Sequence, residues 1–129
     1  MESRFLVDTN ILIYSFSKVI PKKIQDIITP IYLDSFNISV INQIEFLGWR
    51  ELNDQEFNQA IRFINNARVY SISDRIVDET IKIRRDVKIK IPDAIIAATC
   101  LVNDFVLLTR NTSDFLTIEG LKFLDPFEQ

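Results

Sequence analysis

The pattern of apolar and polar residues along the chain predicts short strands separated by helices. Short alternating or continuously apolar runs are typical of strands, and apolar residues at every third or fourth position are typical of helices. We expect strands at residues 4–7, 37–40, 68–72, 105–109 and 121–124. We expect helices at residues 21–33, 41–52, 74–87 and 92–103, a helix that follows Asn53, and a short helix or turn at 9–17. Strands that alternate with helices predict an α/β fold with a mainly parallel sheet.

Local sequence signals predict several of the helix ends. Asn53 is a good N-cap, and Glu56 three residues later completes a capping box before apolar residues recur at helical spacing through Ile64. Pro21 fits the first turn of its helix, whereas Pro30 falls inside that helix and should perturb it.

The size of the chain suits one domain with one core, and no linker or repeat divides residues 1–129. No apolar run approaches the roughly 18 to 20 residues that span a bilayer. The first four residues, Met-Glu-Ser-Arg, do not read as a signal peptide. We therefore expect a single cytoplasmic domain.

Several residue types that catalysis often uses are missing. The chain has no His, so triads and imidazole bases are excluded, and its two Gly cannot form a glycine-rich phosphate loop. The single cysteine, Cys100, can form no internal disulfide or zinc site, and we expect it to pack inside an apolar helix. Carboxylates, hydroxyls, amides and cations remain for chemistry.

Four carboxylates stand beside apolar runs that read as core, where an unpaired charge is costly. Asp8 ends the first strand, Glu45 lies in an apolar helix, Asp93 begins another, and Asp114 follows a strand after a short polar loop. In α/β sheets the loops at the carboxyl ends of the strands build the site. If the fold brings these acids together, a cation must offset their repulsion, which is the arrangement of a divalent-metal site for phosphodiester chemistry.

Each carboxylate also has a simpler interpretation. Asp8 and Asp114 could be helix caps, and Asp93 could be a residue that the helix dipole favours in a first turn. On a wheel of residues 41–52, Glu45 falls inside the apolar face, either as a ligand or as a core-rim residue. The neighbours that surround it there are Ile41, Gly48, Trp49 and Leu52, whereas Asn42, Gln43 and Arg50 lie elsewhere.

The formal charge of -3 first argues against a nucleic-acid partner. If a metal neutralises four acids, however, the 15 basic residues outnumber the remaining acids by one. A basic run just before Asp93 is either a solvated helix end or a phosphate-binding rim. The run comprises Lys82, Arg84, Arg85, Lys88 and Lys90.

Four stretches recur in order along the chain. They are Leu-Val-Asp-Thr-Asn-Ile-Leu-Ile from Leu6, residues 39–45 with the following Phe-Leu, Pro-Asp-Ala-Ile-Ile-Ala-Ala-Thr from Pro92, and Leu-Leu-Thr-Arg-Asn-Thr-Ser-Asp-Phe from Leu107. Together they resemble the PIN domain family, and within it the small VapC-type toxins of toxin–antitoxin pairs. The likeness extends over essentially the whole chain, including Leu-Lys-Phe-Leu near its end.

The resemblance implies a three-layer α/β/α fold and an endoribonuclease that uses Mg²⁺ or Mn²⁺. It implies that Asp8, Glu45 and Asp93 are metal ligands and that Asp114 is a fourth, a place that Asn111 can share. The matching supporting polar positions are Thr9, Asn10, Ser39 and Thr109. The cations near positions 82–90 and Arg110 would hold RNA. A small VapB-like antitoxin and a toxin homodimer are the implied partners.

Other α/β classes fit less well. A phosphatase of the haloacid dehalogenase type needs a second Asp where this chain has Asn10. A signalling receiver domain needs paired acids after the first strand and a Lys after a late one, where the nearest cation is Arg110. A PIN nuclease of RNA processing and an inactive PIN-like binding module remain alternatives.

Overall fold

One parallel sheet organises the protein. The computed structural model describes residues 4–17 and 19–129. Residues 1–3, which belong to the stretch that we do not expect to be a signal peptide, lie outside the described part. The sheet order is β3-β2-β1-β4-β5, and every neighbouring pair is parallel. The strands are β1 (Arg4–Val7), β2 (Asn37–Ser39), β3 (Arg68–Tyr70), β4 (Phe105–Leu108) and β5 (Lys122–Leu124). This confirms the α/β fold with a parallel central sheet.

Within the described residues, six α-helices and one short 3₁₀ helix connect the strands, and a second 3₁₀ helix follows the last strand. The α-helices are α1 (Thr9–Ser17), α2 (Lys22–Asp34), α3 (Val40–Leu47), α4 (Asp54–Ile64), α5 (Asp74–Asp86) and α6 (Ile91–Asn103). The 3₁₀ helices are η1 (Thr112–Asp114) and η2 (Pro126–Glu128). No helix of the described chain is long and apolar enough to cross a membrane.

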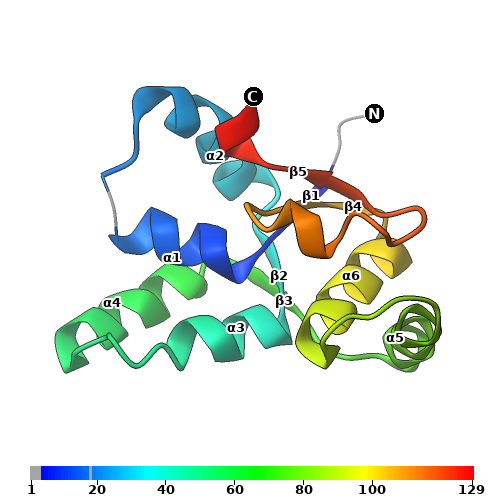
Figure 1. Ribbon diagram of the computed structural model, residues 1–129. Helices are drawn as coiled ribbons and strands as arrows, with labels where there is room; N and C mark the ends of the chain where they lie inside the picture. The colour runs from blue at the N-terminus through cyan, green and yellow to red at the C-terminus, as the bar shows by residue number, and fades with distance from the viewer. Residues whose placement is uncertain (1–3, 18) are drawn as a thin grey trace.

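Successive side chains of the central strands point to opposite faces of the sheet and build two apolar cores, one on each face. Leu6 and Leu107, which pair across β1 and β4, lie in the core that α5 and α6 cover, and Cys100 is buried there as expected. Val7 and Leu108, the next pair, lie in the core beneath α1, α2 and α4. Figure 1 shows α5 and α6 together on one side of the strands and α1 and α4 on the other. The result is the expected three-layer arrangement.

The strand order changes direction at β1. The chain adds β2 and then β3 on one side of β1, and afterwards places β4 and β5 on the other side. In parallel α/β sheets such a reversal opens a crevice at the carboxyl ends of the strands, where ligands bind. The residues that follow β1 and β4 therefore lie at the favoured position for a functional site.

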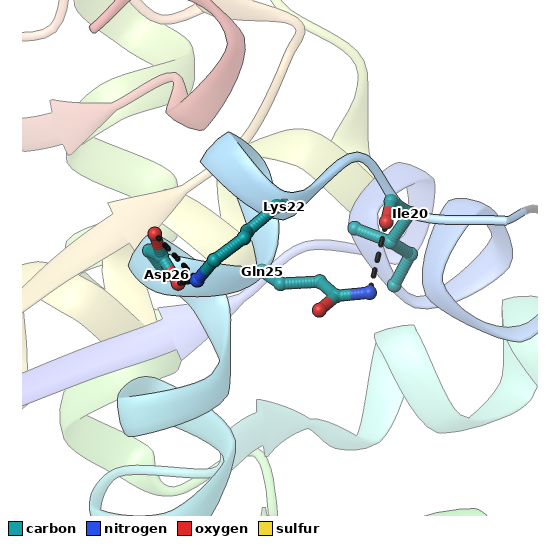
Figure 2. Close-up of polar contacts among 4 residues, drawn as sticks. All are labelled: Ile20, Lys22, Gln25 and Asp26. Atoms are coloured by element: carbon teal, nitrogen blue, oxygen red, sulfur yellow. Dashed lines mark hydrogen bonds and ion pairs between the residues drawn. The ribbon is translucent and has the colours of Figure 1, made fainter.

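The ends of α2 and α4 follow the sequence signals. Pro21 precedes α2, and the first turns of this helix carry an exposed ion pair between Lys22 and Asp26 at 3.1 Å (Figure 2). Pro30 lies inside α2, yet the helix continues to Asp34. In α4 the predicted capping box is present, because Asn53 Oδ1 accepts from the Glu56 N–H at 2.8 Å and Glu56 Oε1 accepts from the Asn53 N–H at 3.0 Å.

Figure 2 also shows that the side chain of Gln25 reaches back to the segment before α2. Gln25 Nε2 donates to the Ile20 carbonyl oxygen at 2.9 Å. This bond and the exposed ion pair fix the local path of the chain, and each contributes little to global stability.

The helix after β2 is shorter than expected. It ends at Leu47 rather than at residue 52, and the Gly48 N–H donates to the Ile44 carbonyl oxygen at 2.8 Å to close the last turn. Trp49 and Leu52 therefore lie outside α3, in the connection to α4. This difference removes two of the neighbours that had placed Glu45 on an apolar helix face.

Candidate active site

Asp8 lies at the point where the strand order reverses. It is the residue after β1, its N–H donates to the Leu108 carbonyl oxygen at 2.9 Å, and only 5% of it is exposed. Its own carbonyl oxygen accepts from the Ile11 and Leu12 N–H groups, so its backbone also starts α1. The predicted position at the end of a core strand is thus confirmed.

Four donors hold the Asp8 carboxylate. Oδ1 accepts from the Thr9 N–H at 2.8 Å, which is a local contact of the kind that a cap makes, and from Asn42 Nδ2 at 3.3 Å. Oδ2 accepts from Thr109 Oγ1 at 2.9 Å and Asn10 Nδ2 at 3.3 Å. Donors from three separate segments therefore fix the orientation of this side chain.

Burial makes the Asp8 carboxylate basic despite these donors. Desolvation is the largest cause that raises the pKa of Asp8, from 3.8 to about 6, and the negative charges of Asp93 and Glu45 raise it further. The bonds from Thr109 and Thr9 lower it. Metal ligation would offset this cost, because a cation favours the ionised form.

Asp93 shares the same electrostatic environment. It lies in the first turn of α6 and is partly buried. Desolvation raises the pKa of Asp93, the charges of Asp114 and Glu45 raise it further, and Lys90 lowers it. The charges of Glu45 and Asp93 thus act on Asp8, and those of Glu45 and Asp114 act on Asp93.

Glu45 occupies a different environment from the one expected. It is exposed on α3, whereas Asn42 and Phe46 form the fully buried face of that helix and Ile44 is 63% exposed. Glu45 Oε1 accepts from Thr9 Oγ1 at 2.7 Å. The apolar-face argument was therefore wrong, although Glu45 does lie beside the residue that follows Asp8.

Asn42 is the site residue that sequence reasoning missed. The helical wheel placed Asn42 away from the face around Glu45, yet Asn42 is fully buried and donates both to Asp8 Oδ1 and to Thr9 Oγ1, the latter at 3.0 Å. Its Oδ1 accepts from the Ser39 N–H at 2.8 Å. An amide three residues after the N-cap Ser39 was the available signal, since this position can complete a capping box.

The supporting polar positions that the resemblance implied lie together around Asp8. Ser39 caps α3 by accepting from the Ile41 N–H at 3.0 Å. Thr109 is fully buried, and its hydroxyl oxygen accepts from Asn10 Nδ2 at 3.2 Å and the Asn111 N–H at 2.9 Å. The carboxyl ends of β1, β2 and β4 are thus tied by side-chain hydrogen bonds.

Asp114 lies at the outer edge of this group. It is the last residue of η1, is exposed, and accepts from Asn111 Nδ2 at 2.7 Å. No helix starts after it, because Phe115 and Leu116 continue into turns, so the interpretation of Asp114 as a helix cap was wrong. The structure places Asn111 and Asp114 side by side.

The donor chemistry of the four acids suits a hard divalent cation. Within residues 4–17 and 19–129, no three Asp, Glu or Cys side chains form a ready metal-binding cluster. Thr9 and Asn111 instead hold the Glu45 and Asp114 carboxylates, and like charges repel in the absence of a cation. All the available ligands are oxygen atoms, which fits Mg²⁺ or Mn²⁺.

A groove of about 500 Å³ joins two of the four acids to part of the basic run. Asp93 and Asp114 line it together with three of the predicted RNA-binding cations. These cations are Arg84, Lys88 and Lys90. Arg84 also donates to the Ile89 carbonyl oxygen, so its guanidinium helps to hold the segment between α5 and α6. Arg85 is exposed on α5 and does not line this groove.

Arg110 has a partner that its sequence position did not suggest. Its guanidinium carbon lies 3.8 Å from the centroid of the Phe127 ring, and its backbone N–H donates to Asn10 Oδ1 at 3.1 Å. The Phe127 ring in turn packs edge-on against Tyr14. Arg110 therefore joins the loop after β4 to the C-terminal η2.

Solved structures of toxin–antitoxin complexes contain chains with this fold. A chain of a toxin–antitoxin complex from Klebsiella pneumoniae is 30% identical, with a TM-score of 0.76 and coverage of 95% of this chain and 97% of that chain. A chain of DNA-bound VapBC from Salmonella typhimurium is 21% identical, with a TM-score of 0.84 and coverage of 97% and 99%. A chain of FitAcB from Neisseria gonorrhoeae is 18% identical, with a TM-score of 0.81 and the same coverage. Curated proteins gave no match.

The family comparison covers the site and the fold together. The PIN domain model matches residues 5–120, which include β1 through η1 and all four candidate acids. PIN domains are generally nucleases. The match extends over most of the sequence, and the chain therefore belongs to the PIN domain family.

Proposed function

We propose that this protein is a metal-dependent endoribonuclease and the toxin of a type II toxin–antitoxin pair. The observation that carries the nuclease proposal is a pair of carboxylates, Asp8 and Asp93, whose pKa values are raised first by burial and then by neighbouring negative charges, together with a groove that Asp93, Asp114 and three cations line. Carboxylates whose ionised form is disfavoured in this way suit a site that binds a cation.

Asp8, Glu45 and Asp93 would hold Mg²⁺ or Mn²⁺, with Asp114 as a fourth ligand. Such a metal would supply activation of a water molecule and would offset the negative charge that develops on the phosphate. The protein's own contribution is to orient the acids: Thr109, Asn10 and Asn42 fix Asp8, and Thr9 holds Glu45. No His is needed as a base in this scheme.

The cations of the groove would position the RNA. Lys88 and Lys90 line it within reach of the same space as Asp93 and Asp114. Contacts from lysines to the flanking phosphates would place one phosphodiester bond against the acids without reading its bases. Arg84 would contribute through the loop that it braces.

The toxin role rests on likeness to chains found in toxin–antitoxin complexes over nearly the full length. We propose a small VapB-like antitoxin as partner and a homodimer as the assembled toxin. A short neighbouring reading frame that encodes a DNA-binding protein, together with restored growth when the two genes are expressed jointly, is the expected outcome. Growth inhibition that this neighbour cannot relieve would contradict the toxin assignment.

The nuclease proposal is tested by incubating structured RNA with the purified protein and Mg²⁺ or Mn²⁺. We expect cleavage by the wild type, no cleavage in EDTA, and at least a hundredfold slower cleavage by Asp8→Asn, because the central ligand is lost. Asp26→Asn is the matched control, since Asp26 is exposed on α2 and should leave the rate unchanged. Equal cleavage by wild type, Asp8→Asn and the EDTA sample would reveal a contaminating nuclease and sink the proposal.

A further inference from the structure

Asn42 lies between two of the candidate acids. It is fully buried at the start of α3, where the end of β2 approaches the end of β1. Its side chain contacts Asp8 directly and reaches Glu45 through one intermediate, Thr9. A buried amide is generally found with its hydrogen bonds made.

The backbone fixes the orientation of the Asn42 amide. The Ser39 N–H is a donor, so the atom of Asn42 that lies 2.8 Å from it must be the accepting Oδ1. Nδ2 then points the opposite way, towards Asp8 Oδ1 at 3.3 Å and Thr9 Oγ1 at 3.0 Å. The two protons of Nδ2 match these two acceptors.

The amide also determines which way the Thr9 hydroxyl points. A hydroxyl carries one proton and accepts through its lone pairs. Because Thr9 Oγ1 accepts from Asn42 Nδ2, its own proton is free to be donated to Glu45 Oε1, 2.7 Å away. A chain of donors therefore runs from the Ser39 backbone through Asn42 and Thr9 to Glu45.

We propose that Asn42 is a positioning residue that holds Asp8 and Glu45 in a fixed relation, so that both carboxylates can bind the same cation. This inference rests on the proposed metal-dependent function. It assigns Asn42 no contact with the metal or the RNA. Residues that hold ligands by hydrogen bonds commonly affect metal affinity by about 10- to 100-fold.

The test measures Mn²⁺ affinity by isothermal titration calorimetry, without RNA. Asn42→Ala should weaken Mn²⁺ binding about tenfold or more. Thr9→Val removes the hydroxyl and keeps the branched shape, so it should weaken binding as well, whereas Thr9→Ser should keep most of the affinity. The double variant Asn42→Ala with Thr9→Val should lose less Mn²⁺ binding free energy than the sum of the losses in the two single variants, because Asn42 acts partly through Thr9.

Asn37→Ala is the matched control for a general loss of stability. Asn37 Nδ2 donates to the Phe5 carbonyl oxygen at 2.8 Å, so it also joins β2 to β1, but at the opposite end of the strands. This variant should unfold at a lower temperature than the wild type and bind Mn²⁺ as the wild type does.

RNA cleavage by Asn42→Ala provides a second measurement. Excess Mn²⁺ should restore much of the cleavage rate of this variant, and its KM for RNA should equal that of the wild type.

The outcomes separate this inference from the proposed function. If the wild type binds Mn²⁺ and cleaves RNA while a folded Asn42→Ala binds Mn²⁺ equally well, the positioning role is wrong and the nuclease remains. If the wild type binds no Mn²⁺, both are overturned. Should Asn42→Ala fail to fold, the comparison of Thr9→Val with Thr9→Ser decides, and equal affinity in these two variants would overturn the link to Glu45.

Discussion

The Thr109 hydroxyl donates to Asp8 Oδ2 at 2.9 Å, although the two residues are 101 positions apart in the chain. Parallel pairing of β1 with β4 produces this contact, because Val7 and Leu108 are partners in register and the next residue of each strand lies beside the other. A buried hydroxyl therefore meets a buried carboxylate at the point where the strand order reverses. Thr109 therefore holds Oδ2 of Asp8 from the neighbouring strand end, while the Thr9 N–H holds Oδ1 locally.

We expect Thr109→Val to slow RNA cleavage by about tenfold or more, in the range known for residues that orient metal ligands. Valine keeps the shape of the side chain and removes only the donor, so Asp8 loses the bond that most lowers its pKa. Thr109→Ser retains the hydroxyl and should remain close to the wild-type rate. Steady-state cleavage at fixed Mn²⁺ measures the difference, and equal rates for the Val and Ser variants would count against this role.

The raised pKa of Asp8 predicts that the metal-free protein becomes less stable as the pH rises from about 4 to 6. In this window the folded state binds more protons than the unfolded state, because the pKa of Asp8 is about 6 when folded and 3.8 ordinarily. A difference of this size corresponds to about 3 kcal/mol of lost stability at pH 7. Urea unfolding in EDTA at a series of pH values measures it.

Asp8→Asn is the control for this pH dependence. The variant has no carboxylate to titrate at this position, so its free energy of unfolding should fall less steeply between pH 4 and 6. Addition of Mn²⁺ should stabilise the wild type at pH 7 and have little effect on the variant, since a ligand stabilises only the state that binds it. Identical pH profiles for the two proteins would rule out Asp8 as the source of the effect.

The parts of the site that follow strands could be predicted from the sequence. Short apolar runs indicated β1 and β4, and a parallel sheet places the residues after such strands at one edge. Asp8 lies where the pattern predicted, whereas Thr109, expected as the last residue of a strand, follows β4, which ends at Leu108. Their direct contact depends on the register of β1 with β4, which only the structure shows.

The environment of α3 could not be predicted in the same way. A helical wheel groups residues by their apolar neighbours, and it placed Glu45 within the apolar face of the expected helix and Asn42 away from that face. The structure reverses this, because the polar residues Asp8 and Thr9 provide partners that let an amide be buried, and because the helix ends before Trp49. Tertiary hydrogen bonds, and not the periodicity of the helix, decide which face is buried.

Arg110 gives a prediction that separates stability from RNA binding. Its guanidinium lies over Phe127, and contacts of this kind stabilise by roughly 0.5 to 2 kcal/mol. We expect Arg110→Ala to lower the free energy of unfolding by about 1 kcal/mol and to change RNA affinity less than the loss of a groove lysine does. Chemical denaturation and filter binding measure the two effects, and a large loss of RNA affinity with unchanged stability would restore Arg110 as a phosphate ligand.

The contact between Asn111 and Asp114 allows the fourth ligand to be identified. Asn111 Nδ2 donates to Asp114 Oδ2, so the amide orients the carboxylate and its own oxygen is directed elsewhere. We expect Asp114→Ala to weaken Mn²⁺ binding about tenfold and Asn111→Ala to weaken it less. Calorimetric titration of both variants decides between them, and the opposite order would assign the ligand role to Asn111.

The lysines of the groove predict how RNA binding depends on salt. Lys88 and Lys90 line the groove beside Asp93 and Asp114, so replacement of either by Ala should reduce the slope of log affinity against log salt by about 0.7 for single-stranded RNA. The measurement uses Asp8→Asn as the background, which slows cleavage, at several KCl concentrations. Lys23→Ala is the matched control, because Lys23 is exposed on α2 and lies outside the groove. An equal change of slope in all three variants would mean that RNA is attracted by the overall charge of the protein and not by this groove.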